Sequence, residues 1–133
     1  MSNKTGVAIY CRLARKDRQI IKQQKAEMLA YAKGQGYENI SVYSDNGYSG
    51  TNFIRPAFMR MENDIAAGKI GLVISKNISR IGRDYIGVAT WFDRIEQDGI
   101  SFISVSDGIT SPFITAIGNT IQQAYREYCA QQR

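Results

Sequence analysis

The stretch VAIYCRLARKD, residues 7 to 17, decides how the fold is predicted. Its first five residues are almost entirely apolar and include two β-branched side chains, which is typical of a strand buried on both faces. Arg12 follows this strand directly, and Ala14 stands two positions further on. Functional groups of open α/β sheets gather beyond the carboxyl ends of the strands, so this arginine marks a candidate site.

Three more runs have the composition of buried strands, and helical patterns alternate with them. The strand-like runs span 40–44, 70–75 and 100–105. The helical patterns span 18–33, 56–67 and 84–98, and each is followed by a glycine suited to a helix C-terminus, at Gly34, Gly68 and Gly99. This alternation predicts an α/β domain with a mostly parallel sheet of four to five strands and helices on both faces.

The last segment has a helical pattern of its own. Ser111 suits the N-cap of a helix and Pro112 its first position. Apolar residues then recur at helical spacing, at Phe113, Ile117, Ile121, Ala124 and Tyr128. The chain reaches Arg133 without a glycine or proline stop signal. We therefore expect a long helix from residue 111 that continues beyond the residues given.

The composition excludes several classes of protein. The 133 residues include no histidine, which removes the commonest general base and the commonest metal ligand. Cys11 and Cys129 lie too far apart in the sequence to form a redox or metal-binding pair, and we expect both to be reduced in a cytosolic protein. No apolar run is long enough to cross a membrane, and the N-terminus does not resemble a signal peptide.

The net charge of +5 is unevenly distributed. Residues 1–33 hold eight lysines and arginines against two acidic residues. A basic N-terminal third suggests a polyanionic partner. On charge alone, however, a solvated and lysine-rich helix face is the stronger interpretation.

Arginines follow three of the four predicted strands. Arg12 follows the first, Arg55 lies in the loop after the second, and Arg80 and Arg83 follow the third. The planar guanidinium matches phosphate oxygens two at a time, and several of them suit a phosphoryl centre whose charge grows in the transition state. Arg80 and Arg83 could instead be surface residues at a helix start. The helix dipole disfavours cations there, so we favour a bound anion.

Two further residues are ambiguous from the pattern alone. Arg55 precedes Pro56 at a predicted helix start. Gln24 lies on the apolar face of the first helix, with Ile20, Ile21, Met28, Leu29 and Ala32. A buried glutamine is usually satisfied by local partners, but this one could equally orient a group of the site.

Other phosphate chemistries fit poorly. The chain has no GxxxxGK[ST] phosphate loop. Cys11 and Arg18 are one residue too far apart for a cysteine phosphatase loop, and the rim around Asp45 is basic where a phosphoacceptor site is acidic. A small phosphatase or nuclease stays open as an alternative class, which a Mg²⁺ requirement would favour.

The same segments resemble the serine recombinases, in particular the large serine recombinases and transposon resolvases of mobile elements. The resemblance covers nearly the whole chain. It rests on AIYCRLA (8–14), IIKQQKAEMLAYA (20–32), YSDNGYSGTNFIRPAF (43–58), KIGLVISKNISRIGRD (69–84), SDGITS (106–111) and AYREY (124–128). Each segment is moderately specific, and their order and spacing together are highly specific.

The resemblance implies a role for each site residue. The family carries its nucleophilic serine in a Y-x-R-x-S pattern, and Ala14 occupies that position. Arg12, Arg80 and Arg83 would bind and polarise the scissile DNA phosphate, and Gln24 would lie beside the nucleophile. The supporting positions are Asp45, Arg55, Ser79, which is an aspartate in small resolvases, and Glu127 of the last helix.

The mechanism implied by the resemblance is phosphoryl transfer without metal or cofactor. A serine attacks a phosphodiester of double-stranded DNA and forms a 5′-phosphoserine bond, within dimers that assemble into tetramers. Residues 1–110 would form the catalytic domain, and 111–133 would begin a dimerisation and DNA-contacting helix. The DNA-binding domains would lie outside this chain.

Ala14 departs from the family pattern, and a methyl group cannot attack phosphorus. The resemblance therefore implies a recombinase catalytic domain that does not cut DNA in this form. Two explanations stay open: a serine replaced by alanine to stop cleavage, or a degenerate DNA-binding and assembly module. The retained arginines favour a deliberate or recent change.

Overall fold

The computed structural model describes residues 6–106 and 109–110. The strands are β1 (Gly6–Leu13), β2 (Ile40–Asn46), β3 (Ile70–Ser75), β4 (Ser101–Ser104) and β5 (Ile109–Thr110). The helices are α1 (Arg18–Gly34), α2 (Pro56–Ala66), α3 (Ile78–Ile81) and α4 (Tyr85–Gln97). The predicted helix from residue 111 lies outside the described residues.

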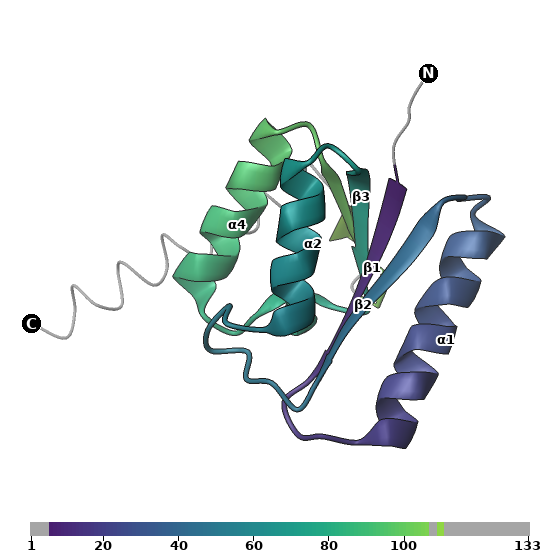
Figure 1. Ribbon diagram of the computed structural model, residues 1–133, viewed down its shortest axis with the longest axis vertical. Coiled ribbons are helices and arrows are strands. Elements are labelled where there is room, and N and C mark those ends of the chain that lie inside the picture. The colour runs from purple at the N-terminus through teal and green to yellow at the C-terminus, as the bar shows by residue number, and fades with distance from the viewer. Residues whose placement is uncertain (1–5, 107–108, 111–133) are drawn as a thin grey trace, which may run out of the picture.

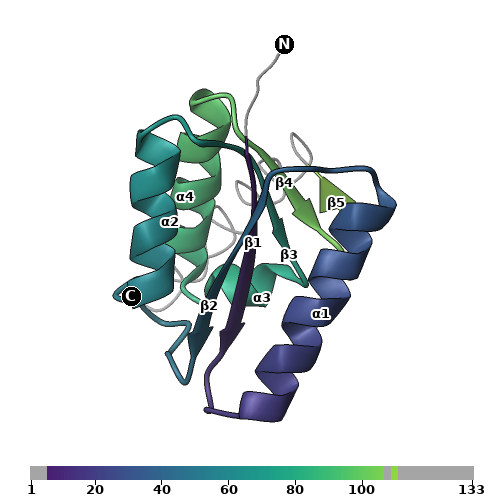
Figure 2. The same ribbon diagram turned by 45° about the vertical axis from the view of Figure 1, so that its right-hand side comes forward.

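The sheet has the order β2-β1-β3-β4-β5, and β1 to β4 are parallel (Figures 1 and 2). Only β5 runs antiparallel, against β4. The chain passes from β1 to β2 on one side and then crosses to β3 on the other, so the strand order reverses at β1. Ligands of open α/β sheets bind at such a reversal, outside the carboxyl ends of the strands. The predicted α/β fold is confirmed.

Alternate residues of β1 belong to the cores on the two faces of the sheet. Val7, Ile9 and Cys11 pack toward α1, whereas Ala8 and Tyr10 pack in the core that includes α2 and α4. Figure 1 shows α1 on one face of the sheet and the pair α2 and α4 on the other. Because successive side chains of a strand alternate between faces, Arg12 lies on the same face as Tyr10.

Three details of the predicted elements are wrong. Strand β1 continues to Leu13, so Arg12 lies inside the strand and Ala14 is the first residue beyond it. Gly34 is the last residue of α1, and Gly36, with φ 84°, takes the left-handed position that ends the helix. Ile20 is 49% exposed, because only the stripe around Ile21 and Met28 faces the sheet.

Candidate active site

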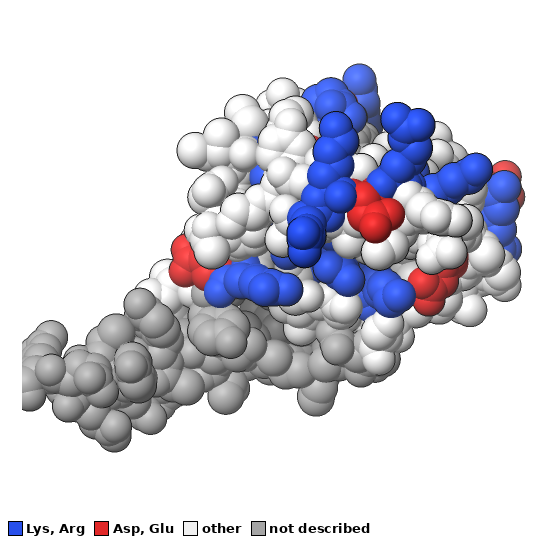
Figure 3. Space-filling model, turned by 90° about the horizontal axis from the view of Figure 1, so that it is seen from below, with Lys and Arg blue, Asp and Glu red and all other residues white. Residues whose placement is uncertain are grey.

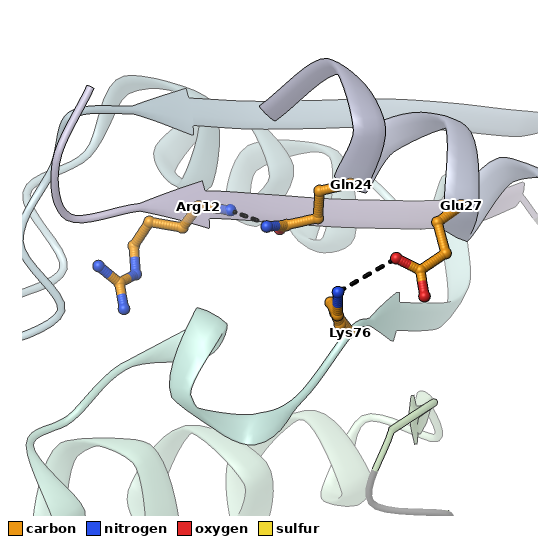
Figure 4. A network of polar contacts seen from close by, with 4 residues as sticks. All are labelled: Arg12, Gln24, Glu27 and Lys76. Carbon is orange, nitrogen blue, oxygen red and sulfur yellow. Dashed lines mark hydrogen bonds and ion pairs between the residues drawn. The ribbon is translucent and has the colours of Figure 1, made fainter. Parts of the chain in front are cut away.

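Position 14 lies at the carboxyl end of the central strand and is exposed. Strand β1 pairs with β3 only as far as Tyr10, so beyond that point the edge of β1 facing β3 has no strand partner. There the backbone N–H of Arg12 donates to Oε1 of Gln24 at 3.2 Å (Figure 4). Gln24 is 3% exposed and comes from α1. It thus holds the end of the strand that presents position 14.

The guanidinium of Arg12 is fully buried and bonded to backbone carbonyls. Its Nε donates to the carbonyl of Arg80 at 3.0 Å and its Nη2 to that of Ser79 at 2.6 Å. Its Nη1 donates to the carbonyl of Tyr48 at 2.9 Å. Carbonyls in the last turn of a helix have no partner within the helix. Arg12 therefore fixes the short helix α3 to the end of β1.

Arg55 holds the same helix from a second side. Its guanidinium is also fully buried and donates to the carbonyls of Arg80, at 3.3 Å, and of Ile81. It lies over the ring of Phe53, with 4.8 Å from Cζ to the ring centroid. In the structure, this side chain is thus buried against the end of α3; whether it also takes part in chemistry stays a prediction.

These buried arginines concentrate positive charge. Burial, followed by repulsion from Arg55, lowers the pKa of Arg12 to about 10, and Arg83 and Arg80 act in the same direction. Among the described residues, no carboxylate forms an ion pair with Arg12 or Arg55. Arginine stays protonated in proteins, so the lowered pKa expresses the cost of holding this charge away from water. A bound anion would offset that cost.

Arg80 and Arg83 do not lie together at one helix start, and that prediction is wrong. Arg80 belongs to α3, whereas Arg83 is exposed and precedes α4. Nε of Arg80 is buried and has no hydrogen-bond partner among the described residues. Ser79 is partly buried and donates through Oγ to Asn77 at 2.6 Å. The case for an anion therefore rests on the local charge and not on a helix dipole.

Figure 3 views the end of the molecule at which the parallel strands stop, and lysine and arginine side chains gather on it. Exposed cations follow β1 in the chain and continue into the first turns of α1, at Arg15, Lys16, Arg18 and Lys22. Near the end of β3, Lys76 forms an ion pair with Glu27 of α1 at 3.2 Å (Figure 4). The basic N-terminal third predicted from the sequence thus adjoins position 14.

Two residues of this site were not predicted from the sequence. Tyr10 donates its hydroxyl to Oδ2 of Asp45 at 2.7 Å and accepts from Nη1 of Arg55 at 3.0 Å. Gly50 lies between two arginines, and a Cβ there would be 2.7 Å from Nη2 of Arg12 and 3.2 Å from Cγ of Arg83. Both residues lie in segments that carry the family resemblance, Tyr10 as the first residue of the Y-x-R-x-S pattern and Gly50 within residues 43–58, but neither was assigned a role.

Asp45 is 2% exposed, and its carboxylate caps the N-terminus of α2. Its Oδ1 accepts from the backbone N–H of Ala57 at 2.9 Å and its Oδ2 from that of Phe58 at 3.0 Å. A carboxylate at a helix N-terminus satisfies free N–H groups and interacts favourably with the dipole. Of the predicted supporting residues, Asp45, Arg55 and Ser79 thus lie around α2 and α3. Glu127 lies outside the described residues.

Within residues 6–106 and 109–110, no group of three or more cysteine, aspartate or glutamate side chains is arranged to hold a metal ion. No helix in that part of the chain is long and apolar enough to cross a membrane.

Comparison with known proteins assigns the family. The family model "Resolvase, N terminal domain" matches residues 7–132. The chain belongs to this family. The membership agrees with the resemblance drawn from the sequence motifs, and the match covers the strands and loops that surround position 14.

Solved structures of this fold include recombinase domains. The N-terminal catalytic domain of TP901-1 integrase is 27% identical, with a TM-score of 0.80 over 96% of this chain and 98% of that one. A resolvase family site-specific recombinase from Streptococcus pneumoniae is 30% identical, with a TM-score of 0.78 over 97% and 93% of the two chains.

One curated relative is much longer than this chain. The Bacillus subtilis (strain 168) protein named "Putative DNA recombinase" is 29% identical over 102 residues. The match takes in 75% of this chain but only 20% of that protein. The chain thus corresponds to about a fifth of this relative.

Proposed function

We propose that this chain is the catalytic domain of a serine site-specific DNA recombinase of the large branch, with its nucleophile position occupied by alanine. The observation that carries the proposal is the place of Ala14. It is the first residue beyond the central strand, exposed, and only two residues from the buried Arg12. Membership of the resolvase family supports the assignment. The Y-x-R-x-S pattern of the serine recombinases, which the sequence resembles, would place the serine at this position.

The reaction needs a hydroxyl at this position. The serine oxygen attacks phosphorus of a DNA phosphodiester and loses its proton. The bond from phosphorus to the 3′ oxygen breaks, that oxygen gains a proton, and a 5′-phosphoserine bond conserves the energy for rejoining. The pentacoordinate transition state carries extra negative charge, which guanidinium groups stabilise.

The arginines divide this work between them. Arg83 is exposed, and Arg80 carries a buried and unpaired Nε, so we assign direct phosphate contacts to these two. Arg12 donates to carbonyls of α3 and β2–α2 loop residue Tyr48 in this structure. We therefore assign Arg12 an indirect role. It holds α3 in place, and its buried positive charge adds to the electrostatic attraction for the phosphate.

The supporting residues place these groups. Gln24 fixes the end of β1, and Asp45 anchors the start of α2. The partner in this proposal is double-stranded DNA, within a dimer or tetramer of the whole protein. Residues 111–133, including Glu127, would start the dimerisation helix.

The second candidate is a DNA-binding and assembly module without catalysis, and Ala14 itself favours it. Restoring the hydroxyl separates the two candidates. The full-length protein with Ala14→Ser is mixed with duplex DNA from the ends of its mobile element, denatured, and examined for protein attached to DNA. The Ala14 protein serves as the matched control.

A covalent adduct with the Ala14→Ser protein alone is the expected result. Specific DNA binding without any adduct would refute the recombinase proposal and favour the binding module. Chelation of divalent metal tests the third class, because a metal-dependent nuclease or phosphatase would lose activity and the proposed mechanism would not.

A further inference from the structure

Ser75 is the last residue of β3 and the last to pair with β1. Its side chain is fully buried, at the end of a strand that otherwise consists of apolar residues and one glycine. The hydroxyl donates to the backbone carbonyl of Tyr10 at 2.8 Å. Carbonyls between paired strands ordinarily accept from backbone N–H groups, so a side chain supplies this bond where the pairing ends.

The main chain at Ser75 is bonded on its other side. Its carbonyl accepts from the backbone N–H of Val105 at 3.0 Å. The carbonyl of Lys76 accepts in the same way from the backbone N–H of Ser106 at 2.7 Å. These two bonds hold the chain to the segment that follows β4, whereas the Ser75 hydroxyl reaches back to β1. The junction between β3 and α3 is thus fixed from both sides.

Helix α1 bridges the opening between β1 and β3 that begins after this pair. Gln24 accepts from the backbone N–H of Arg12 on one side of the opening. Glu27, one turn later in α1, forms the ion pair with Lys76 on the other side (Figure 4). The Glu27 side chain is 53% exposed, and ion pairs of exposed side chains contribute little. The buried hydroxyl of Ser75 is therefore the stronger connection.

The opening separates the two parts of the proposed site. Beyond it β1 leads to position 14, whereas the chain after β3 leads into α3, which carries Arg80. Only Lys76 lies between Ser75 and Asn77, the N-cap residue of α3. A change in the point at which β1 and β3 part would therefore move the start of α3 relative to position 14.

We propose that Ser75 is a positioning residue, whose hydroxyl fixes the point at which β1 and β3 part and thereby the distance from position 14 to Arg80. The inference rests on the proposed function, since it gives Ser75 a part in DNA cleavage. Ser75 is fully buried and acts only through the backbones of β1 and α3. Without its hydroxyl, the carbonyl of Tyr10 loses this donor, and the two backbones can separate or pair further.

Thr90 provides a matched control. Its hydroxyl also donates to a backbone carbonyl, that of Ile86, at 2.8 Å. The bond lies within α4, so Thr90→Val removes a bond of the same kind and length without changing the junction after β3. Two further variants at the site itself refine the comparison. Ser75→Thr keeps the hydroxyl, and Ser75→Cys keeps the approximate size of the side chain but offers only a weak donor.

The first measurement needs no DNA. Hydrogen exchange is followed at the backbone amides of Arg80, Val105 and Ser106, which lie in α3 and against the junction. We expect Ser75→Ala to speed exchange at these amides by about fivefold or more relative to the amides of α1, because a buried carbonyl loses its donor. Ser75→Thr should stay within about twofold of wild type, because it retains the bond. Thr90→Val should leave the three amides unchanged. If Ser75→Ala does not fold, Ser75→Cys takes its place with the same expectation.

The second measurement adds each change to Ala14→Ser and follows adduct formation with mobile-element-end DNA. At saturating DNA we expect Ser75→Ala to slow adduct formation by about tenfold or more, on the order of what misplacement of catalytic groups costs. The DNA concentration for half-saturation should stay within about twofold, because the positioning acts on the transition state and not on overall DNA binding. Ser75→Thr should restore most of the rate, and Thr90→Val should change neither quantity.

The two measurements separate the inference from the proposed function. Exchange that rises equally at all amides, or does not rise at all, overturns the inference. An adduct rate that Ser75→Ala leaves unchanged overturns it as well. If Ala14→Ser alone forms no adduct, the proposed function fails, and the exchange comparison still decides whether Ser75 fixes the start of α3.

Discussion

Replacing Gly50 with alanine tests whether the buried arginines order the site. The added Cβ would lie 2.7 Å from Nη2 and 3.0 Å from Cζ of Arg12. An arginine usually yields at its flexible end, but this guanidinium is fully buried and bonded to three carbonyls. To move away it must break at least the bond from Nη2 to Ser79.

The magnitude follows from the bonds at stake. A hydrogen bond from a charged group contributes about 1.5 to 3 kcal/mol, and a buried acceptor left without a partner costs a similar amount. We expect Gly50→Ala to lower the free energy of unfolding by about 2 to 4 kcal/mol. That is a large share of the roughly 5 to 15 kcal/mol by which domains are stable. The melting temperature should fall by about 6 to 15 °C.

Urea and thermal unfolding, followed by circular dichroism, measure the effect. Gly34→Ala is the control, since a Cβ there meets nothing within 4 Å and the residue lies in α1. It should raise stability by about 0.5 to 1 kcal/mol, because glycine is the poorer helix former. If Gly50→Ala unfolds within about 0.5 kcal/mol of wild type, the guanidinium is not fixed, and the reasoning about Arg12 fails.

Three further predictions concern charge and protonation. Millimolar inorganic phosphate should raise the melting temperature of wild type more than that of Arg83→Gln, because the anion offsets the concentrated positive charge. Neutralising the exposed cations of α1 with Arg18→Gln and Lys22→Gln should weaken binding of random duplex DNA. The slope of the logarithm of the binding constant against the logarithm of the salt concentration should become shallower by about 2. The control Lys69→Gln, at the opposite end of the sheet, should change neither quantity. Burial raises the pKa of the Cys11 thiol from 9.0 to about 12, so the unfolded chain releases this proton first. The unfolding free energy should therefore be unaffected by this thiol below pH 9 and fall as pH rises toward 12, and urea titrations of Cys11→Ala should show a shallower fall.

The sequence predicted best those strands and helices in which a single apolar pattern runs from the first residue to the last. Strand β3 begins and ends where its apolar run does, and Gly68 and Gly99 take the left-handed positions after α2 and α4. Helix α3 and strand β5 contain only four and two residues. Elements that short carry no measurable period, and contacts with the rest of the chain determine them.

The sequence pattern named several residues that the fold brings close together, but it did not predict how they are connected. The pattern placed Arg12, Asp45 and Arg55 near the rim because each follows a predicted strand, although Arg12 and Asp45 prove to be part of β1 and β2. It gave no sign that two buried guanidinium groups would bond to the carbonyls of α3, because carbonyls have no sequence signature. The contact of Tyr10 could not be predicted for a related reason: the family pattern includes this tyrosine, but its hydroxyl meets Asp45, which lies 35 residues away. Long-range polar contacts of this kind depend on the folded backbone.

The most direct test of the account is to identify the residue that becomes joined to DNA. Ala14→Ser protein is captured on DNA, digested with nuclease and protease, and analysed by mass spectrometry. The account predicts a nucleotide linked through its 5′ phosphate to the serine introduced at position 14. A link to any other residue, or through a 3′ phosphate, would contradict the assignment of position 14 as the place of the nucleophile.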